Sequence, residues 1–461
     1  MRDIILSLIL TSLMPACFRR PFVGLVVFSW LAYMRVQDLT WGFAKHTRWS
    51  YYVAILTFAG YLLSKERRRF FLPEPRCWLL IAMTGLVGLG VLLARPPHDE
   101  AYTRYVEYVK IIAIALFTTA IVFNRERLRV MVWLIALSLG FYGVKFGIWG
   151  IKSGGTSIIL QGPGGMLADN NDMALALAMA TPMLFILGWT ERLPLLRRAF
   201  FVILPLTVMS VGLTQSRGGF LAVSMGIGVL VWRSRNRLMG LGVGVLVAVL
   251  AFALMPASYK ERLATIGEYE TEGSARGRIR AWGIATRMAL ANPVLGVGLT
   301  KFRQHFVEHA PDAMPWEKAG KGVIVAHSSY FQIWAECGSL VLALYLGMIF
   351  SCFWTIWRIR KEARTRYFSS WILNYATMFE ATLATFCVGA TFLNRGHFDL
   401  LYHWVALIVV FAQLARQEMR DVTLYPVRAG VRGEIRHVPR RGFAARPGRR
   451  GFGEAAQPHG V

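Results

Sequence analysis

The sequence predicts an all-α membrane protein whose chain crosses the bilayer many times. Hydrophobic residues make up 55% of the 461 positions, and the mean hydropathy is +0.44. Soluble domains have a lower apolar content, of about 45–50%. The apolar residues are gathered into about 13 long runs, and short basic clusters separate many of them. These three observations together indicate a polytopic, helical membrane protein with one large loop that contains short helices.

The apolar runs fix the expected order of the membrane helices. They lie at 3–17, 21–35, 50–64, 77–94, 107–123, 128–149, 172–189, 199–214, 219–233, 238–256, 328–357, 370–392 and 399–416. A full span needs about 20 residues, so the first two runs are short. They predict a tight hairpin, tilted helices or incomplete spans, and the expected total is therefore about 12–13.

The positive charge of the chain predicts its orientation. The formal net charge is +26, which in a soluble protein would suggest nucleic acid as a partner. Here the basic residues sit in short connections between apolar runs, which is the positive-inside pattern and argues against a nucleic-acid partner. The less basic or longer connections then face outward, which in a bacterium is the periplasmic side of the inner (plasma) membrane. These outward connections are 36–49, 95–106, 150–171, 215–218, 257–327 and 393–398.

The chain divides into three parts. Residues 1–195 are expected to form an N-terminal transmembrane region, and 196–416 a catalytic membrane core that includes the outward loop 257–327. Residues 417–461 are basic, rich in Arg, Gly and Pro, and are expected to form a disordered cytoplasmic tail near anionic lipid headgroups. The loop 257–327 is too long for a simple connection. Its apolar spacing predicts one helix over 274–291 and a shorter one over about 299–309.

Arginines on the outward side are candidates for binding a phosphate group. Arg217 lies in Gly-Leu-Thr-Gln-Ser-Arg-Gly-Gly between two apolar runs, where its planar guanidinium can hold a phosphate with two hydrogen bonds. It is equally consistent with an interfacial arginine that reaches lipid headgroups. Arg276, Arg278 and Arg280 form a cationic cluster at the start of the loop helix, which suits a diphosphate or a solvated helix end.

His327 is the candidate general base. Its ordinary pKa near 6.5 lets it accept a proton from a hydroxyl at neutral pH, although a lone histidine is more often structural. Ser328, Gln332 and Glu336 follow at steps of four and share one helix face. Glu336 lies in an apolar run, where an ionisable group is a functional candidate. It could orient His327, orient polar neighbours, or pair with an arginine for packing.

Other charged residues define the competing interpretations. Arg395 and His397 are expected to add charge to the outward side, as secondary candidates. Lys145, Glu380 and His403 lie inside apolar runs, which is a pattern that a transporter would use. Glu268, Glu270 and Glu272 favour a solvated acidic loop over a cation site. The five cysteines form no CxxC pair and are expected to be free thiols, so neither a metal site nor a nucleotide site is predicted.

The order of these motifs resembles a known superfamily. Ser-Arg-Gly-Gly follows an apolar run, Arg278-x-x-x-Trp282 and Asn-Pro-Val-Leu-Gly-Val-Gly lie in the long loop, and His-Ser-x-x-x-Gln-x-x-x-Glu-x-Gly opens the next run. Together they resemble the O-antigen ligase and polymerase superfamily. The N-terminal part through Leu-Thr-Trp-Gly-Phe-Ala resembles the branch of putative O-glycosylation ligases associated with the exosortase A system.

The resemblance implies a membrane glycosyltransferase. Such an enzyme takes a glycan from an undecaprenyl-diphosphate carrier and passes it to an acceptor hydroxyl on a lipid, a glycan or a protein, at the periplasmic face. By motif match, Arg217 and Arg278 would bind the diphosphate and His327 would be the base, with Arg280 added by proximity. Ser328 stands where an Asn often follows the histidine. Inversion at the anomeric carbon is expected, without a metal or other cofactor. A polymerase of the same superfamily and a polyprenyl-glycan transporter or flippase are the alternatives.

Overall fold

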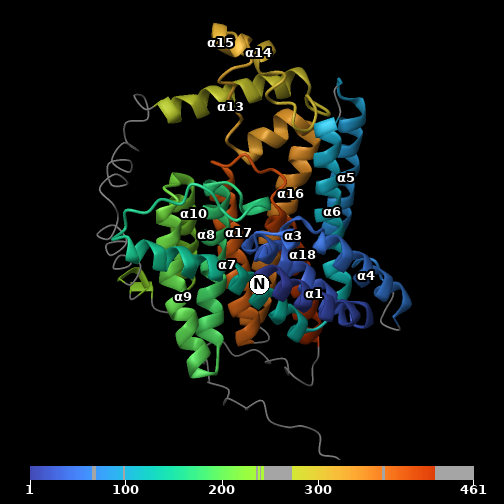
Figure 1. The fold of residues 1–461 in the computed structure, drawn as a ribbon, viewed down its shortest axis with the longest axis vertical. Helices are drawn as coiled ribbons and strands as arrows, with labels where there is room; N and C mark the ends of the chain where they lie inside the picture. The colour runs from blue at the N-terminus through green and yellow to red at the C-terminus, as the bar shows by residue number, and fades with distance from the viewer. Residues whose placement is uncertain are drawn as a thin grey trace, which may run out of the picture.

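The computed structural model describes residues 1–64, 69–96, 99–234, 237–238, 240–242, 273–365 and 369–420. Within these ranges the chain forms helices joined by turns, and no β-strand is found (Figure 1). The predicted all-α class is therefore confirmed. Of the predicted features, Glu268, Glu270, Glu272 and most of the run 238–256 lie outside the described residues.

Each apolar run that the structure describes coincides with a helix. The first half of the chain holds α1 (Arg2–Arg19), α2 (Pro21–Tyr33), α4 (Trp49–Leu63), α5 (Pro75–Leu93), α6 (Asp99–Ile121) and α7 (Arg125–Lys152). The second half holds α8 (Asn170–Thr190), α9 (Pro194–Leu213), α10 (Arg217–Arg233), α16 (Ser329–Thr365), α17 (Ser370–Ala390) and α18 (Asp399–Arg420). The apolar runs thus located most helix ends to within about five residues, but α6 begins eight residues before its run and α16 ends eight residues after its run.

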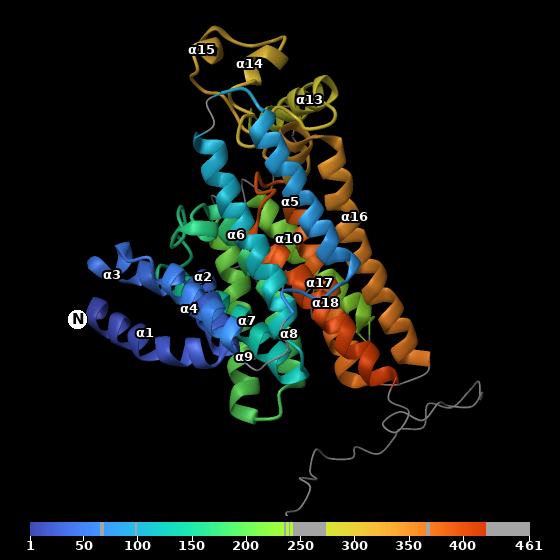
Figure 2. The same ribbon diagram turned by 90° about the vertical axis from the view of Figure 1, so that its right-hand side faces the viewer.

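Among the described helices, 6 are long and apolar enough to cross a membrane: α5, α7, α8, α9, α16 and α18. This supports a multi-pass membrane protein. Helices α1, α2, α4 and α10 have 18, 13, 15 and 17 residues, which is shorter than the usual span of about 20. As expected for short helices, α1 runs obliquely to the direction of α5 and α6 (Figure 2).

Helix α8 lies at the centre of the bundle, in contact with α7, α9, α10 and α17. It is almost entirely buried because alanines dominate its middle, and small side chains let neighbouring helices approach closely. Gly219 of α10 packs against Ala174 so closely that a β-carbon on it would lie 2.5 Å from the alanine methyl. Helices α1, α2 and α4 form a separate, smaller apolar cluster at the side of the bundle (Figure 2).

The described part of the large loop lies across one end of the bundle (Figure 1). Its main element is α13 (Gly273–Ala291), close to the predicted helix over 274–291. The second predicted helix, over about 299–309, was wrong in length. Only α14 (Phe306–His309) forms, because Thr300 adopts a left-handed backbone with φ of 64° and interrupts a helix there. A further turn, α15 (Pro315–Lys318), was not predicted.

The predicted boundary between the last membrane helix and the tail differs from the structure. Helix α18 continues to Arg420, so the first residues of the predicted tail are helical. The remaining tail, 421–461, lies outside the described residues.

The expectation of free cysteines is confirmed, since all five are free thiols and four of them are buried.

Candidate functional site

The turn before α10 places Arg217 at the end of the bundle that carries α13. Ser216 caps α10, since its hydroxyl accepts a hydrogen bond from the Gly219 amide at 3.1 Å and donates one to Asn171 at 2.7 Å. Gly218 lies against Phe392, where an added β-carbon would be 2.8 Å from the phenylalanine Cβ. The paired glycines therefore allow Arg217 to sit where α8, α10 and the segment after α17 meet.

Helix α13 brings Arg278 to the same place. The Arg278 guanidinium lies over the ring of Phe392, 6.0 Å from its centroid. One turn later, Trp282 stacks on Phe331 of α16 with ring centroids 5.2 Å apart and an interplanar angle of 10°. Because Arg278 and Trp282 are four residues apart, this stacking fixes the helix face that carries Arg278. Phe392 thus lies between the Arg217 turn and Arg278.

His327 lies directly before α16, exposed and with a left-handed backbone of φ 48°. Its side chain makes no hydrogen bond to a described residue. Partial burial lowers the pKa of His327 below its usual value, and the positive charges of Arg278 and Arg303 lower it further, while Asp169 opposes them. The imidazole is therefore neutral at pH 7 and able to accept a proton.

Arg395 takes part in a buried polar connection between α8 and α16. Its Nε donates to the Asp172 carboxylate at 2.7 Å, and its backbone amide donates to the Ser329 hydroxyl at 3.2 Å. The next amide, of Gly396, donates to Gln332 Oε1 at 3.0 Å. Arg395 and Gln332 therefore hold the segment between α17 and α18 in place beside the Arg217 turn.

Glu336 anchors Gln332 and the loop rather than His327. Its buried carboxylate accepts hydrogen bonds from Gln332 Nε2 at 3.2 Å and from the Phe302 amide at 3.4 Å. Among the described residues no hydrogen bond joins it to His327. Of the two orienting roles considered for Glu336, the geometry fits the one toward its polar neighbours. Ser328 is fully buried, and its hydroxyl has no hydrogen-bond partner in the described part of the chain.

His397 differs from the expectation that it adds charge to this side. Its ring packs against Tyr108 with centroids 4.5 Å apart. Burial lowers the pKa of His397 to about 4, so the ring is neutral at pH 7. The side chain contributes packing and no charge, because the segment after α17 turns it into the bundle.

Arg280 is paired with carboxylates within the loop, and its assignment to the diphosphate stays a prediction. Its two terminal nitrogens donate to both carboxylate oxygens of Glu317 at 2.6 and 2.8 Å, and its Nε donates to Asp312 at 2.7 Å. The hydrogen bonds from Arg280 lower the pKa of both carboxyl groups. Arg280 therefore ties the segment around α15 to α13, and its neighbour in the sequence motif, Arg278, points elsewhere.

The intramembrane residues that favoured a transporter are all satisfied locally. Glu380 accepts hydrogen bonds from Arg233 and lies 2.5 Å from a terminal nitrogen of Arg360. His403 is hydrogen bonded to the Tyr33 hydroxyl at 2.7 Å and to Thr118 at 3.1 Å. Lys145 lies over the rings of Tyr142 and Phe146. Each group therefore has a packing role that needs no transported ion.

The turn that contains Gly296 and Gly298 packs against the kink of α16 at Gly338, a contact that the sequence did not predict. The amides of Val297 and Gly298 donate to the carbonyls of Ala335 and Glu336 at 2.9 and 3.0 Å. Helix α16 is broken at Gly338, whose φ is 85° and whose added β-carbon would lie 2.2 Å from the Val294 carbonyl oxygen. The turn after α13 therefore packs onto the kink of α16. This contact fixes α13, which carries Arg278, relative to α16, which His327 precedes.

Three residues of this region were also missed: Asp169 and Arg303, whose charges act on His327, and Phe392, which lies against Arg278 and Gly218. Asp169 lies in the outward connection 150–171, but nothing in the sequence distinguished it from Asp172. Arg303 and Phe392 gave no signal, because their importance depends on contacts between distant segments. Among the described residues, no group of three His, Cys, Asp or Glu side chains forms a candidate metal site.

Comparison with protein families agrees with this arrangement. Residues 199–346 match the family model described as O-Antigen ligase (Wzy_C), and residues 1–192 match a family of unknown function (DUF5935). Arg217, Arg278 and His327 all fall inside the first match. No curated protein matches the chain. The first match supports the superfamily of membrane ligases and polymerases, and with it lipid-linked glycan and acceptor partners in general; the exosortase-associated branch stays a prediction.

Proposed function

We propose that this protein transfers a glycan from an undecaprenyl-diphosphate carrier to an acceptor hydroxyl at the periplasmic face of the inner membrane. One observation carries the proposal: the exposed His327 lies within the influence of Arg278, Arg303 and Asp169, at the end of the bundle where Arg217 begins α10. The match of residues 199–346 to the O-antigen ligase family supports the same reaction class.

In the proposed reaction His327 is the general base. The neutral imidazole accepts the proton of the acceptor hydroxyl, and the oxygen attacks the anomeric carbon from the side opposite the carrier. The bond between that carbon and the diphosphate oxygen breaks, and its electron pair stays on the diphosphate. Because the displacement is direct, the anomeric configuration is inverted. The Asp169 carboxylate stabilises the imidazolium that forms, by its negative charge.

Arg217 and Arg278 bind the diphosphate in this proposal. Negative charge builds on the leaving diphosphate as the bond breaks, and fixed cations stabilise that charge more than they stabilise the bound donor. The carrier linkage supplies the free energy, so no nucleotide is required. We propose that the arginines also make a metal unnecessary. Transfer that EDTA abolishes and a divalent cation restores would contradict this part of the proposal.

The test is transfer by the purified full chain in lipid nanodiscs. The donor is a labelled glycan on undecaprenyl diphosphate, and separate reactions supply a glycolipid, a free glycan and a hydroxyl-bearing peptide as acceptors. The peptide is included because of the resemblance to putative O-glycosylation ligases. We expect the label to move to one acceptor with inverted configuration; a ladder of longer carrier-linked chains would identify a polymerase. Label that stays on the carrier in every reaction, but crosses a vesicle bilayer, would support a transporter instead.

A further inference from the structure

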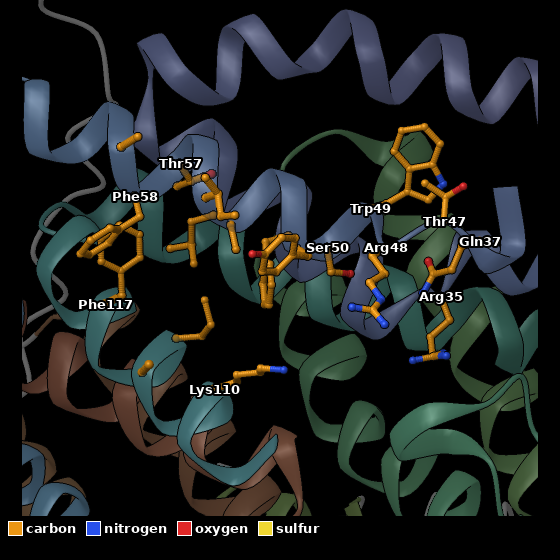
Figure 3. A pocket seen from close by; sticks show the side chains of 18 of the residues that line it. Arg35, Gln37, Thr47, Arg48, Trp49, Ser50, Thr57, Phe58, Lys110 and Phe117 are labelled. Atoms are coloured by element: carbon orange, nitrogen blue, oxygen red, sulfur yellow. The ribbon is translucent and has the colours of Figure 1, made fainter. Parts of the chain in front are cut away.

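A partly open cavity lies at the side of the bundle, away from the His327 site. It is lined mainly by α4, α6 and the segment between α2 and α4, and its volume is about 1220 Å³. This exceeds the roughly 300–1,000 Å³ of pockets that hold small molecules. Figure 3 shows that the aromatic side chains Phe58 and Phe117 gather at one end of the cavity and basic side chains at the other.

The apolar end is built from one face of α4. Tyr51, Ile55, Phe58 and Leu62 follow at helical spacing, line the cavity and are 44–57% exposed. Phe117 of α6 faces them, with its ring centroid 6.1 Å from that of Phe58. Such a stripe on a helix of a membrane protein is in contact with hydrocarbon chains, because exposing these apolar side chains to bulk water would be unfavourable.

The basic end carries Arg48 and Lys110, which approach it from opposite walls (Figure 3). Both are exposed, and neither forms an ion pair with a described residue. Arg35 lies beside them but is neutralised by Asp38, with Nε 2.5 Å from the carboxylate. Lys45 also lines the cavity, so this end has a net positive charge.

We propose that this cavity binds one anionic glycerophospholipid, with its phosphate on Arg48 and Lys110 and its acyl chains along the α4 stripe. Charge complementarity selects the headgroup: the basic end needs net negative charge, which a zwitterionic lipid does not bring. The combination of a cationic end and an apolar stripe in one continuous cavity selects a lipid over a free anion. This inference does not depend on the proposed transferase activity.

The bound lipid would lie next to a segment that reaches the His327 site. The Arg35 guanidinium packs on Gly164 and Gly165, and an added β-carbon on Gly165 would lie 2.2 Å from Arg35 Nη1. The chain then leads within four residues to Asp169, whose charge acts on His327. The lipid headgroup would therefore lie beside the Arg35–Asp38 pair, and Arg35 packs on this glycine segment.

Native mass spectrometry of the purified full chain tests the proposal. The chain is exchanged into nanodiscs that contain equal amounts of phosphatidylglycerol and phosphatidylcholine, and then released from them. We expect one phosphatidylglycerol to remain bound. Each basic residue near an anionic lipid contributes about a factor of five in affinity, so Arg48→Gln with Lys110→Gln should weaken binding about 30-fold. The matched control removes two exposed basic residues that do not line the cavity, by Lys152→Gln and Arg198→Gln, and should bind like the wild type.

A second variant keeps the charges and fills the apolar end. Ala113→Trp places a large ring in the cavity wall of α6 and should also release the lipid, with folding checked by circular dichroism. Equal retention of phosphatidylcholine, or unchanged binding in both variants, would overturn the proposal. Displacement of the phospholipid by undecaprenyl phosphate at equal concentration would assign the cavity to an isoprenoid lipid and would also overturn it.

Discussion

Helix α10 begins and ends with an arginine, and its two ends differ in chemistry. The two residues, Arg217 and Arg233, are about 24 Å apart along the helix axis. Arg233 donates two hydrogen bonds to Glu380, which also pairs with Arg360. Arg217 lies instead at the turn that packs against Phe392, and the Arg278 guanidinium lies over the ring of the same phenylalanine.

The difference separates a structural cluster from a candidate site. At the Arg233 end, the Glu380 carboxylate contacts both Arg233 and Arg360 directly, so it holds the two arginines together within the protein. Near the Arg217 end, Arg278 and Arg303 lower the pKa of the exposed His327, and Asp169 raises it. Arginines that contact a carboxylate stabilise the fold, whereas arginines that set the pKa of an exposed base are suited to chemistry.

The largest expected effect is that of His327→Ala. Loss of a general base typically costs a factor of about 10²–10⁴ in rate, so transfer should fall by that amount. The matched control is His309→Ala in α14, a histidine of the same loop whose Nδ1 lies 3.0 Å from a backbone oxygen. The measurement is the initial rate of label transfer; wild-type activity of the His327 variant would remove its role as the base.

Arg278→Gln should lower the rate by about 10²-fold, as for a lost charge-stabilising group. It should also change the pH dependence. The acid limb of kcat/KM follows protonation of His327, and Arg278 disfavours the protonated form. Removing this positive charge raises the pKa of His327, so the acid limb should move to higher pH. Asp169→Asn should move it to lower pH, because Asp169 favours protonation.

The control for Arg278 is Arg276→Gln, which removes an exposed charge two residues earlier on α13. Profiles of kcat/KM against pH for the three variants distinguish the alternatives. An acid limb that stays in place in both Arg278→Gln and Asp169→Asn would mean that His327 is not the titrating group.

The sequence predicted the helices well and the partners of the charged residues poorly. Apolar periodicity is a local property, so the run 172–189 was enough to predict α8. Arg278 and Arg280 lie two residues apart in one motif, and spacing alone could not show that only Arg280 contacts Glu317. That outcome depends on α15, a turn of four residues with no periodic signal.

Contacts between distant segments explain the remaining misses. Glu380 was a candidate for transport because it lies in an apolar run, and its two arginine partners come from other helices. Phe392 gave no signal as a phenylalanine among many. The shared side of Arg217, Arg278 and His327 was predictable, however, because alternation of basic connections carries that information along the chain.

Glu380→Gln should reduce stability and leave the chemistry intact. Removing one partner of a buried ion pair costs about 3–5 kcal/mol, and partial exposure of this cluster reduces the expected loss to about 2–3 kcal/mol. The rate of transfer per folded molecule should stay unchanged. Thermal inactivation in detergent and the transfer rate measure the two effects, with Glu362→Gln on α16 as the control. Loss of transfer activity at unchanged stability would contradict a purely structural role for Glu380.

The smallest expected effect is at the Arg280–Glu317 pair, and it tests whether Arg280 belongs with the fold or with the diphosphate. If Arg280 only ties α15 to α13, Arg280→Gln and Glu317→Gln each loosen the same contact. Each should then lower kcat/KM by at most about tenfold, which corresponds to about 1.4 kcal/mol. The double variant should cost less than the sum of the two single ones, because both changes remove the same Arg280–Glu317 contact, while the Arg280–Asp312 contact is lost only with Arg280. If Arg280 instead bound the diphosphate, Arg280→Gln would cost far more than Glu317→Gln, and Glu317→Gln would release the arginine and raise the affinity for the donor. The ratio of the kcat/KM values of the two single variants therefore decides whether Arg280 resembles the structural Arg233 or the proposed diphosphate ligand Arg217.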